Sequence, residues 1–341
     1  MKTPDILFYS GNGNHALGAK IMSQLREYLN DKDIDFDHIE FGKFPDEESD
    51  ARIKKFSGVK DKTIVLYQSI FNRYLFEETL QLSWAFKRQY QAKRLILVAP
   101  FMIFRRQDHD EINSEICRLK MTIDRLKHAG VDEIVTVTPH SHKMEEFCKE
   151  FGINFHEADP STIFSETVKA YVSEEPLVYS PDQGSISRAI NLAKANNWPV
   201  IFSLKKRGLN NEIQIMEEEK QEIEKIIQSY QYPIFYASNS KIKGKTIIMI
   251  EDEVSTGGTA NRTGVKLKEN GAGIIIFIST HSILTPGWRR KLFDQNPFDR
   301  VIMGDTIPRD YEKRTGGLIH DISMSDILAR KLYVIIKATK N

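Results

Sequence analysis

The chain has 341 residues, of which 40% are hydrophobic and 28% are charged, and its formal net charge at pH 7 is +1. This length allows two domains of ordinary size, and the near-zero charge argues against nonspecific nucleic-acid binding. No secretory leader and no apolar run of about 20 residues is found, so no membrane association is expected. With two cysteines, Cys117 and Cys148, a disulfide framework is excluded, and both are expected to be buried. We therefore expect a cytoplasmic protein.

Short β-branched runs alternate with amphipathic stretches of helix length along the chain. Strands are predicted at 5–9, 63–67, 94–99, 133–137, 176–179, 199–204, 246–250 and 273–279. Helices are predicted at 14–30, 73–90, 112–128, 141–151, 183–196 and 259–270. Continuous apolar strands separated by helices are typical of a mostly parallel sheet covered on both faces. The sequence therefore predicts an α/β fold.

Three stretches of the first half of the chain recur, in the same order, in the second half. The similar pairs are 7–10 with 177–180, 61–69 with 244–252, and 129–141 with 271–282. Recurrence in a fixed order indicates an internal duplication. We therefore predict two related domains with a boundary near residue 150.

A glycine-rich turn follows an acidic pair in "IEDEVSTGGTA" (250–260). Glu251 and Asp252 come directly after an apolar strand, and ligands of open parallel sheets bind beyond the carboxyl ends of the strands. Two adjacent glycines, before a helix predicted to start near Ala260, can direct backbone N–H groups at an anion. The carboxylates can accept from sugar hydroxyls or hold Mg²⁺. The stretch predicts a phosphorylated sugar as ligand, and an ordinary capped turn is the alternative.

This stretch resembles the phosphoribosyl diphosphate (PRPP) binding motif of type I phosphoribosyltransferases. Two such domains in tandem look like the ribose-phosphate diphosphokinase, or PRPP synthetase, family, whose other motifs are matched in order over nearly the whole chain. These are "FPDEE" (44–48) for Phe-Ser/Pro-Asp-Gly-Glu, "PFMIFRRQDH" (100–109) for Pro-Tyr-…-Ala-Arg-Gln-Asp-Arg, "TPHSH" (138–142) for Asp-Leu-His, "SPDQGSISRA" (180–189) for Ser-Pro-Asp-x-Gly-Gly-x-x-Arg-Ala, and "KKRG" (205–208) for Lys-Arg-Arg.

The resemblance implies two tandem type I phosphoribosyltransferase-like domains related by a pseudo-two-fold duplication, each a mostly parallel sheet flanked by helices. The first domain is expected at 1–150, joined by the C-terminal helix at 322–341. The second is expected at 151–321 and carries the ribose 5-phosphate loop. The family also implies a homo-oligomer that is built from dimers, and it suggests that this oligomer is a hexamer.

The activity that the resemblance implies is Mg²⁺-dependent transfer of the diphosphoryl group of ATP to the C1 hydroxyl of ribose 5-phosphate, giving PRPP and AMP. The implied residues are Lys205 and Arg207 for catalysis; Glu251, Asp252, Ser255, Thr256, Gly257, Gly258 and Thr259 for ribose 5-phosphate; Arg106, Gln107 and Asp108, with Phe44, Asp46 and Glu48 of a neighbouring subunit, for ATP; and His140 and Asp182 for the metal.

The chain departs from the family patterns at several places. Ser255 stands where the family usually has Asp, Thr138 replaces the Asp of Asp-Leu-His, and Glu47 replaces a glycine. The stretch at 109–120 is acidic where the family often has a basic loop, and the interval from 205 to 246 is longer than usual. These departures concern the closure over ATP and the choice of nucleotide.

Each implied site residue also has a structural alternative. His140 could be a structural histidine, Asp182 a helix cap, 205–207 a solvated charge cluster, and 105–108 a surface patch of ion pairs. Two other functions stay open. A phosphoribosyltransferase would use the same glycine turn to consume PRPP, and a non-catalytic PRPP synthetase homologue would bind nucleotide or a partner.

Overall fold

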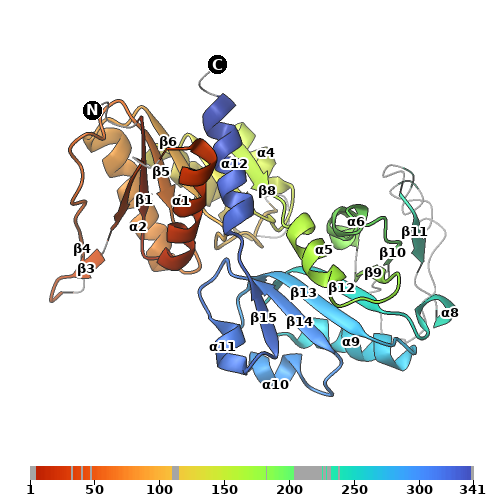
Figure 1. The fold of residues 1–341 in the computed structure, drawn as a ribbon. Coiled ribbons are helices and arrows are strands. Elements are labelled where there is room, and N and C mark those ends of the chain that lie inside the picture. The colour runs from red at the N-terminus through yellow and green to blue at the C-terminus, as the bar shows by residue number, and fades with distance from the viewer. Residues whose placement is uncertain are drawn as a thin grey trace. The chain divides into compact units, whose positions relative to one another are not determined.

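The computed structural model of the chain describes residues 5–31, 34–39, 41–46, 48–109, 115–181, 183–202, 225, 228, 232–236 and 239–338. The chain forms two compact units, each with its own sheet and core (Figure 1). The first unit comprises Met1–Asp159, Gly304–Arg309 and Ser323–Asn341, and the second comprises Pro160–Met303 and Asp310–Ile322.

The first unit is built on a six-stranded sheet of order β2-β1-β5-β6-β7-β8, in which all pairings are parallel. Its strands are β1 (Ile6–Ser10), β2 (Asp35–His38), β5 (Thr63–Tyr67), β6 (Arg94–Val98), β7 (Glu133–Val137) and β8 (Asn154–Ala158). Its helices are α1 (His15–Leu29), α2 (Arg73–Trp84) with the π-helical turn η1 (Ala85–Gln89), α3 (Arg118–Ala129), α4 (Lys143–Glu150) and α12 (Ser325–Ala338). A separate antiparallel hairpin is formed by β3 (Phe41–Lys43) and β4 (Ser49–Ala51).

The C-terminal helix α12 belongs to the first unit, where it packs beside α1 (Figure 1). Leu328, Leu332 and Ile336 repeat at helical spacing and are at most 2% exposed, so the helix buries one apolar face. A polar contact adds to this packing, because the Tyr28 hydroxyl of α1 donates to the Asp326 carboxylate. The chain therefore returns to its first unit after completing the second.

The second unit is built on a seven-stranded sheet of order β11-β10-β9-β12-β13-β14-β15, and β9 to β14 pair in parallel. Its strands are β9 (Leu177–Ser180), β10 (Val200–Phe202), β11 (Ile234–Tyr236), β12 (Ile247–Val254), β13 (Ile275–Ser282), β14 (Arg300–Gly304) and β15 (Ile319–Ile322). Its helices are α5 (Ser161–Lys169), the short 3₁₀ turn η2 (Gln183–Ser185), α6 (Ile186–Lys194), α8 (Asn239–Ile242), α9 (Gly258–Glu269), α10 (Trp288–Leu292) and α11 (Tyr311–Thr315).

The central strands of this sheet are apolar on both faces. In β12, Ile247 and Met249 belong to a core that includes Leu267 of α9, whereas Ile248 and Ile250 point to the other face by strand alternation and are also buried. Helix α6 contacts β9, β10 and β12. Continuous apolar runs at 246–250 and 273–279 were therefore correctly assigned to a parallel sheet between helices.

Strand order shows which of the three sequence repeats are structural equivalents. Counted along the chain, the first sheet has the order 2-1-3-4-5-6, and the second has the same order with β11 inserted as an added edge strand. Strands β1 and β9 are then equivalent, as are β5 and β12, in agreement with the first two repeats. The third repeat is wrong, because it pairs β7 with β13, whereas β13 lies next to β12 and is equivalent to β6. Buried parallel strands share one composition, so similarity alone matched the wrong pair.

The division of the chain also differs from the boundary placed near residue 150. Strand β8 pairs with β7 from Glu133↔Asn154 to Val137↔Ala158, so it extends the first sheet, and the first unit continues to Asp159. The stretch at 304–309 also returns to the first unit, where the Asn14 side chain donates to the Asp305 carbonyl at 2.7 Å.

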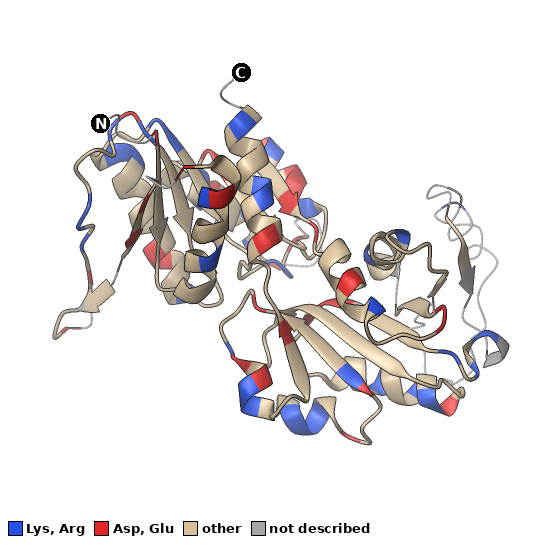
Figure 2. Cartoon of the chain, in the orientation of Figure 1, with Lys and Arg blue, Asp and Glu red and all other residues tan. Residues whose placement is uncertain are grey.

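Charges of both signs are interspersed over the elements of each unit (Figure 2). Of the helices within the described ranges, none combines the length and the apolarity that crossing a membrane requires.

Candidate active site

The acidic pair lies inside strand β12 rather than beyond it. The strand was expected to end at residue 250 but continues to Val254, because its ladder with β13 extends through Glu253↔His281 and Val254↔Ser282. Asp252 is 8% exposed and Glu251 is partly buried. The carboxylates are therefore fixed by the sheet, at the carboxyl edge where ligands of this fold class bind.

The turn after β12 leads directly into α9, which begins at Gly258 and not near Ala260. Gly257 caps this helix in the left-handed region with φ of 79°, and a Cβ atom there would lie 2.7 Å from the Cβ of Leu292. Only glycine meets both demands without strain. The backbone N–H groups at the start of this 12-residue helix provide donors for an anion.

Two threonine side chains of the turn are accessible, and hydrogen bonds hold the turn and the start of α9 to the segment at 285–292. Thr256 and Thr259 are exposed. The Thr285 N–H donates to the Ser255 carbonyl at 3.0 Å, and the Asn261 side chain donates to the Leu292 carbonyl at 3.0 Å. The turn therefore presents hydroxyls and backbone donors from a fixed support.

An arginine that the sequence analysis did not single out lies at the acidic pair. Arg188 of α6 places Nη2 3.7 Å from Oδ1 of Asp252, and the two side chains are 22% and 11% exposed. The hydroxyls of Ser180 and Ser185 lie 2.7 Å apart, and Arg188 follows three residues after Ser185. The motif at 180–189 contained this arginine, so the signal was present without a stated role.

The polar end of β13 was also missed. Ser279, Thr280, His281 and Ser282 are each at most 1% exposed. They form the carboxyl end of the strand next to β12, with His281 opposite Glu253 in the register. A polar end on an otherwise apolar strand is the signal that could have identified them.

In the first unit, two loops at the carboxyl ends of β6 and β7 are joined. Asp108, 4% exposed, accepts a hydrogen bond from the Ser141 hydroxyl. Asp108 and the loop carrying His140 are thus brought together, whereas Arg106 is exposed and Gln107 is partly buried. The expected ATP residues therefore do not share one environment.

Phe44, Asp46 and Glu48, which were expected to contact the ATP of a neighbouring subunit, lie in the turn between β3 and β4. Phe44 is 46% exposed, its N–H donates to the Glu48 carbonyl at 2.8 Å, and the Glu48 N–H donates to Asp46 Oδ1 at 3.2 Å. The turn brings Asp46 and Glu48 together and presents an aromatic ring to solvent. Four other positions of interest, Glu47, Asp182, Lys205 and Arg207, lie outside the described residues.

Magnesium takes oxygen ligands and usually keeps several waters. The carboxylates of Glu251, Asp252 and Glu253 are oxygen donors of the type that this ion requires. His140 offers a nitrogen donor, which fits magnesium less well. The donors present on β12 therefore fit a magnesium–ligand complex by chemical type.

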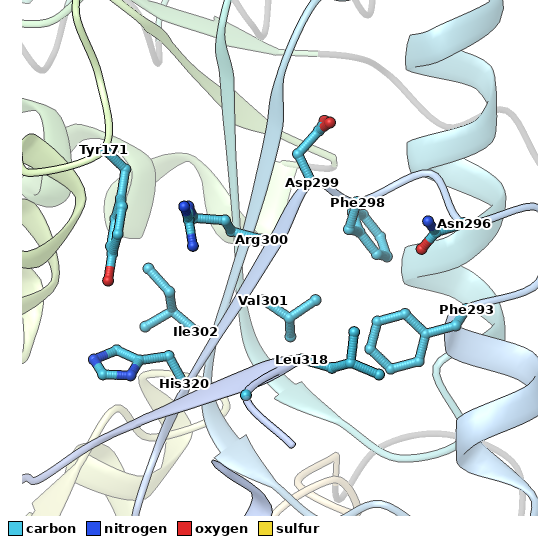
Figure 3. Close-up of a pocket in the computed structure, with 11 residues that line it drawn as sticks. Tyr171, Phe293, Asn296, Phe298, Asp299, Arg300, Val301, Ile302, Leu318 and His320 are labelled. Carbon is cyan, nitrogen blue, oxygen red and sulfur yellow. The ribbon is translucent and has the colours of Figure 1, made fainter. Parts of the chain in front are cut away.

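A cavity of about 320 Å³ in the second unit is separate from these residues (Figure 3). Its wall includes Tyr171, His320 and Leu318, and the Arg300 guanidinium lies 4.3 Å from the centre of the Tyr171 ring. Arg300 begins β14, so the cavity lies toward the amino end of that strand. It is therefore at the opposite edge of the parallel sheet from the turn at 255–257.

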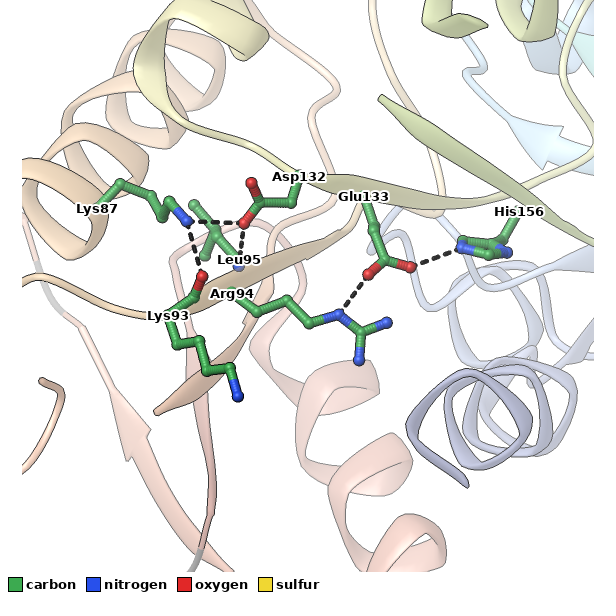
Figure 4. A network of polar contacts seen from close by, with 7 residues as sticks. All are labelled: Lys87, Lys93, Arg94, Leu95, Asp132, Glu133 and His156. Atoms are coloured by element: carbon green, nitrogen blue, oxygen red, sulfur yellow. Dashed lines mark hydrogen bonds and ion pairs between the residues drawn. The ribbon is translucent and has the colours of Figure 1, made fainter. Parts of the chain in front are cut away.

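A polar network near the amino ends of β6 and β7 is likewise outside the candidate site (Figure 4). Glu133, 4% exposed, accepts a hydrogen bond from Arg94 Nε of β6 and lies 2.8 Å from His156 Nε2 of β8. Burial is the largest single influence and raises the pKa of Glu133. Hydrogen bonds and charge from His156 and Arg94 together outweigh it, so the pKa is lowered. The network ties three neighbouring strands together.

Comparison with known proteins agrees with this geometry. The family model for the N-terminal domain of ribose phosphate pyrophosphokinase matches residues 6–130, and the model for the phosphoribosyl synthetase-associated domain matches residues 208–339. The ribose-phosphate pyrophosphokinase of Ralstonia nicotianae is 25% identical over 99% of this chain and 97% of its own length. That of Sulfurisphaera tokodaii is 26% identical over 86% of this chain and 91% of its own length.

A solved structure shares the fold. The crystal structure of the phosphoribosylpyrophosphate synthetase from Mycobacterium smegmatis superposes with a TM-score of 0.77, at 22% identity, over 98% of this chain and all of that chain. The two sheets and their order therefore define an α/β protein with tandem phosphoribosyltransferase-like domains. With both family models matched in sequence order, the chain belongs to the ribose-phosphate pyrophosphokinase (PRPP synthetase) family of enzymes, which confirms the family indicated by its motifs.

Proposed function

We propose that this chain is a ribose-phosphate pyrophosphokinase that transfers the diphosphoryl group of ATP to ribose 5-phosphate. The observation that carries this proposal is the arrangement at 251–259, where a buried carboxylate beside an arginine is followed by a left-handed glycine and a helix N-terminus. Relatives that match nearly the whole chain bear the same name. A sugar phosphate carries both groups that this arrangement suits.

Ribose 5-phosphate binds, in this proposal, with its hydroxyls on Glu251 and Asp252 and its phosphate in the turn. The phosphate accepts from the hydroxyls of Ser255, Thr256 and Thr259 and from backbone N–H groups at Gly257 and Gly258. The exposed threonines and the helix N-terminus support this assignment. Arg188 keeps the Asp252 carboxylate oriented toward the sugar.

The reaction forms a bond between the C1 hydroxyl oxygen of the sugar and the β-phosphorus of ATP. The bond from that phosphorus to the oxygen bridging the α- and β-phosphates breaks, AMP leaves with this oxygen, and the hydroxyl proton passes to solvent. Catalysis of phosphoryl transfer depends mainly on alignment and charge stabilisation. We assign the charge stabilisation to Lys205 and Arg207.

The ATP side of the site is assigned to the first unit. Arg106, Gln107 and Asp108 contact the nucleotide, and the hydrogen bond from Ser141 to Asp108 holds their loop in place. Magnesium, when bound, neutralises phosphate charge and orients the diphosphoryl group. His140 and Asp182 are its proposed protein ligands.

A homo-oligomer based on dimers is part of the proposal. Phe44, Asp46 and Glu48 would contact the adenine bound to a neighbouring subunit, and their exposure on a hairpin turn supports this role. A hexamer and a cytoplasmic location are the further expectations from the family.

The test is AMP formation by the purified chain with Mg²⁺, ATP and ribose 5-phosphate. AMP should increase in proportion to the sugar phosphate, and unphosphorylated ribose is the matched control that should give none. Failure to form AMP from ATP, GMP from GTP or CMP from CTP would refute catalysis and favour a non-catalytic homologue. Release of diphosphate from PRPP with a purine or pyrimidine base, without AMP formation, would instead indicate a phosphoribosyltransferase.

A further inference from the structure

Arg105 is a charged side chain buried in the loop that follows β6. It is 4% exposed, its guanidinium lies 4.6 Å from the centre of the Phe101 ring, and its Nη1 donates to the Thr138 carbonyl at 3.2 Å. Burial of a charged group is costly unless the group is bonded. The two contacts therefore stabilise the side chain, and they join the loop after β6 to the loop after β7.

Thr138 is the first residue after β7, and its backbone is in an unfavourable region. Its φ is 41° and it is 3% exposed. A β-branched residue is strained in the left-handed region and keeps this conformation only when its surroundings hold it there. The hydrogen bond from Arg105 to its carbonyl is one such restraint. The direction of the chain beyond Thr138 is thus linked to the Arg105 guanidinium.

A second contact holds the same loop on the other side of His140. The Ser141 hydroxyl donates to the Asp108 carboxylate, three residues after Arg105. Thr138 and Ser141 bracket His140 in the sequence, and each is bound to the stretch 105–108. The position of His140 is therefore set by two contacts from one neighbouring loop.

We propose that Arg105 is a positioning residue, which presents His140 to the metal–nucleotide complex by holding Thr138. The role of His140 depends on the proposed function, whereas the restraint on the loop depends only on the contacts described. The family pattern has alanine at the position of Arg105 and aspartate at that of Thr138. In this chain the side chain of Arg105 contacts the carbonyl of Thr138, so the two differences from the family patterns lie next to each other in space.

The test compares two substitutions of Arg105, one that removes the hydrogen-bond donor but keeps the apolar packing, and one that keeps a donor. Arg105→Met keeps an apolar chain against Phe101 but has no donor for the Thr138 carbonyl, whereas Arg105→Lys keeps a donor and the charge. Arg118→Met is the matched control, because Arg118 also lies over a phenylalanine of this segment, 5.3 Å from the Phe104 ring, but is exposed. Circular dichroism checks that each variant is folded.

Hydrogen exchange reports on the loop, and the affinity for Mn²⁺ with ATP reports on the site. Hydrogen exchange in the peptide 137–142 should be faster in Arg105→Met, near wild type in Arg118→Met, and intermediate in Arg105→Lys. The affinity for Mn²⁺ with ATP, measured by electron paramagnetic resonance, should fall about 10-fold or more in Arg105→Met, as for other residues that orient a metal ligand. The KM for ribose 5-phosphate should stay within about twofold, since that substrate is assigned to 251–259.

Wild-type exchange and wild-type Mn²⁺–ATP affinity in Arg105→Met would overturn the proposal. Faster exchange with unchanged affinity would overturn the link to His140. If Arg105→Met does not fold, Arg105→Gln takes its place, because the glutamine amide is too short to keep the same contact. The same changes in exchange and in Mn²⁺–ATP affinity are then expected. If the wild-type chain binds no Mn²⁺–ATP, the proposed function fails, and the exchange comparison still decides whether Arg105 restrains the loop.

Discussion

The guanidinium of Arg188 lies 3.7 Å from the carboxylate of Asp252, and both side chains are mostly buried. Arg188 lies on α6 and Asp252 on β12, so the contact joins the motif at 180–189 to the motif at 250–259. A partly buried ion pair limits the rotamers of both side chains. The two motifs therefore lie in contact within the second unit.

Replacing Arg188 should weaken sugar binding more than it slows the chemical step. Arg188→Gln removes the charge that orients Asp252, so we expect the KM for ribose 5-phosphate to rise about 5- to 20-fold with a smaller change in kcat. The Arg188→Gln, Asp252→Asn double variant should lose less than the sum of the single losses, because residues in contact couple by about 0.5–3 kcal/mol. Steady-state kinetics measures both. Strictly additive losses would show that the contact has no role.

The two glycines of the turn should respond differently to alanine. At Gly257, positive φ and the approach of Leu292 together should destabilise the alanine variant by about 2–4 kcal/mol, with loss of sugar binding. At Gly258, the nearest atom to a Cβ is Arg262 Nη1 at 3.6 Å, so alanine should be tolerated and should favour the helix by about 0.5–1 kcal/mol. Urea unfolding of the two variants gives the comparison. Equal losses of stability would contradict this account of the turn.

Lys205 is expected to act in the transition state. Lys205→Ala should reduce kcat by about 100-fold or more with little change in either KM, because its charge is needed most as the diphosphoryl group transfers. Initial rates over a range of both substrates test this. Near-normal turnover of the variant would show that the role is wrong.

The buried network at Glu133 should make stability depend on pH in the acid range. The folded-state pKa of Glu133 is lowered, so its ionisation stabilises the fold above the unfolded-state value of about 4.3, and this contribution is lost as pH falls through the folded value. Glu133→Gln should cost about 1–3 kcal/mol at pH 7, from lost charged hydrogen bonds. The difference from wild type should shrink below about pH 4.3.

Denaturant unfolding between pH 3 and pH 7 measures this difference. The control is Glu150→Gln, which removes a surface ion pair with Lys120 of 2.9 Å and should change stability by less than about 1 kcal/mol. A difference for Glu133→Gln that does not vary with pH would contradict the lowered pKa.

The two cysteines should differ in reactivity. Burial raises the pKa of the Cys148 thiol to about 12, and its side chain is fully buried, so the reactive thiolate is scarce at pH 8. Cys117 is only partly buried, which differs from the expectation that both are core residues. With Ellman's reagent, the native chain should release at most one equivalent rapidly and two in denaturant. Two equally fast native thiols would refute this.

The sequence by itself determined the α/β class, the family and the interior strands of both sheets apart from β14. It did so because apolar runs covered on both faces and a glycine turn after carboxylates are local patterns whose physical cause lies within a few residues. Strands β1, β5, β6, β7, β9, β12 and β13 were expected close to where they lie. Edge strands β2 and β15 were not, because neither DFDH nor IHDI contains a continuous apolar run.

Only the tertiary structure decided which strands are neighbours and which side chains meet. Strand β12 runs four residues beyond its apolar part because β13 provides the pairing, and β8 joins the first sheet because β7 does. The contacts of Arg188 with Asp252 and of Arg105 with Thr138 join positions 64 and 33 residues apart. No local pattern encodes such a contact, since it arises only when two separate chain segments pack side by side.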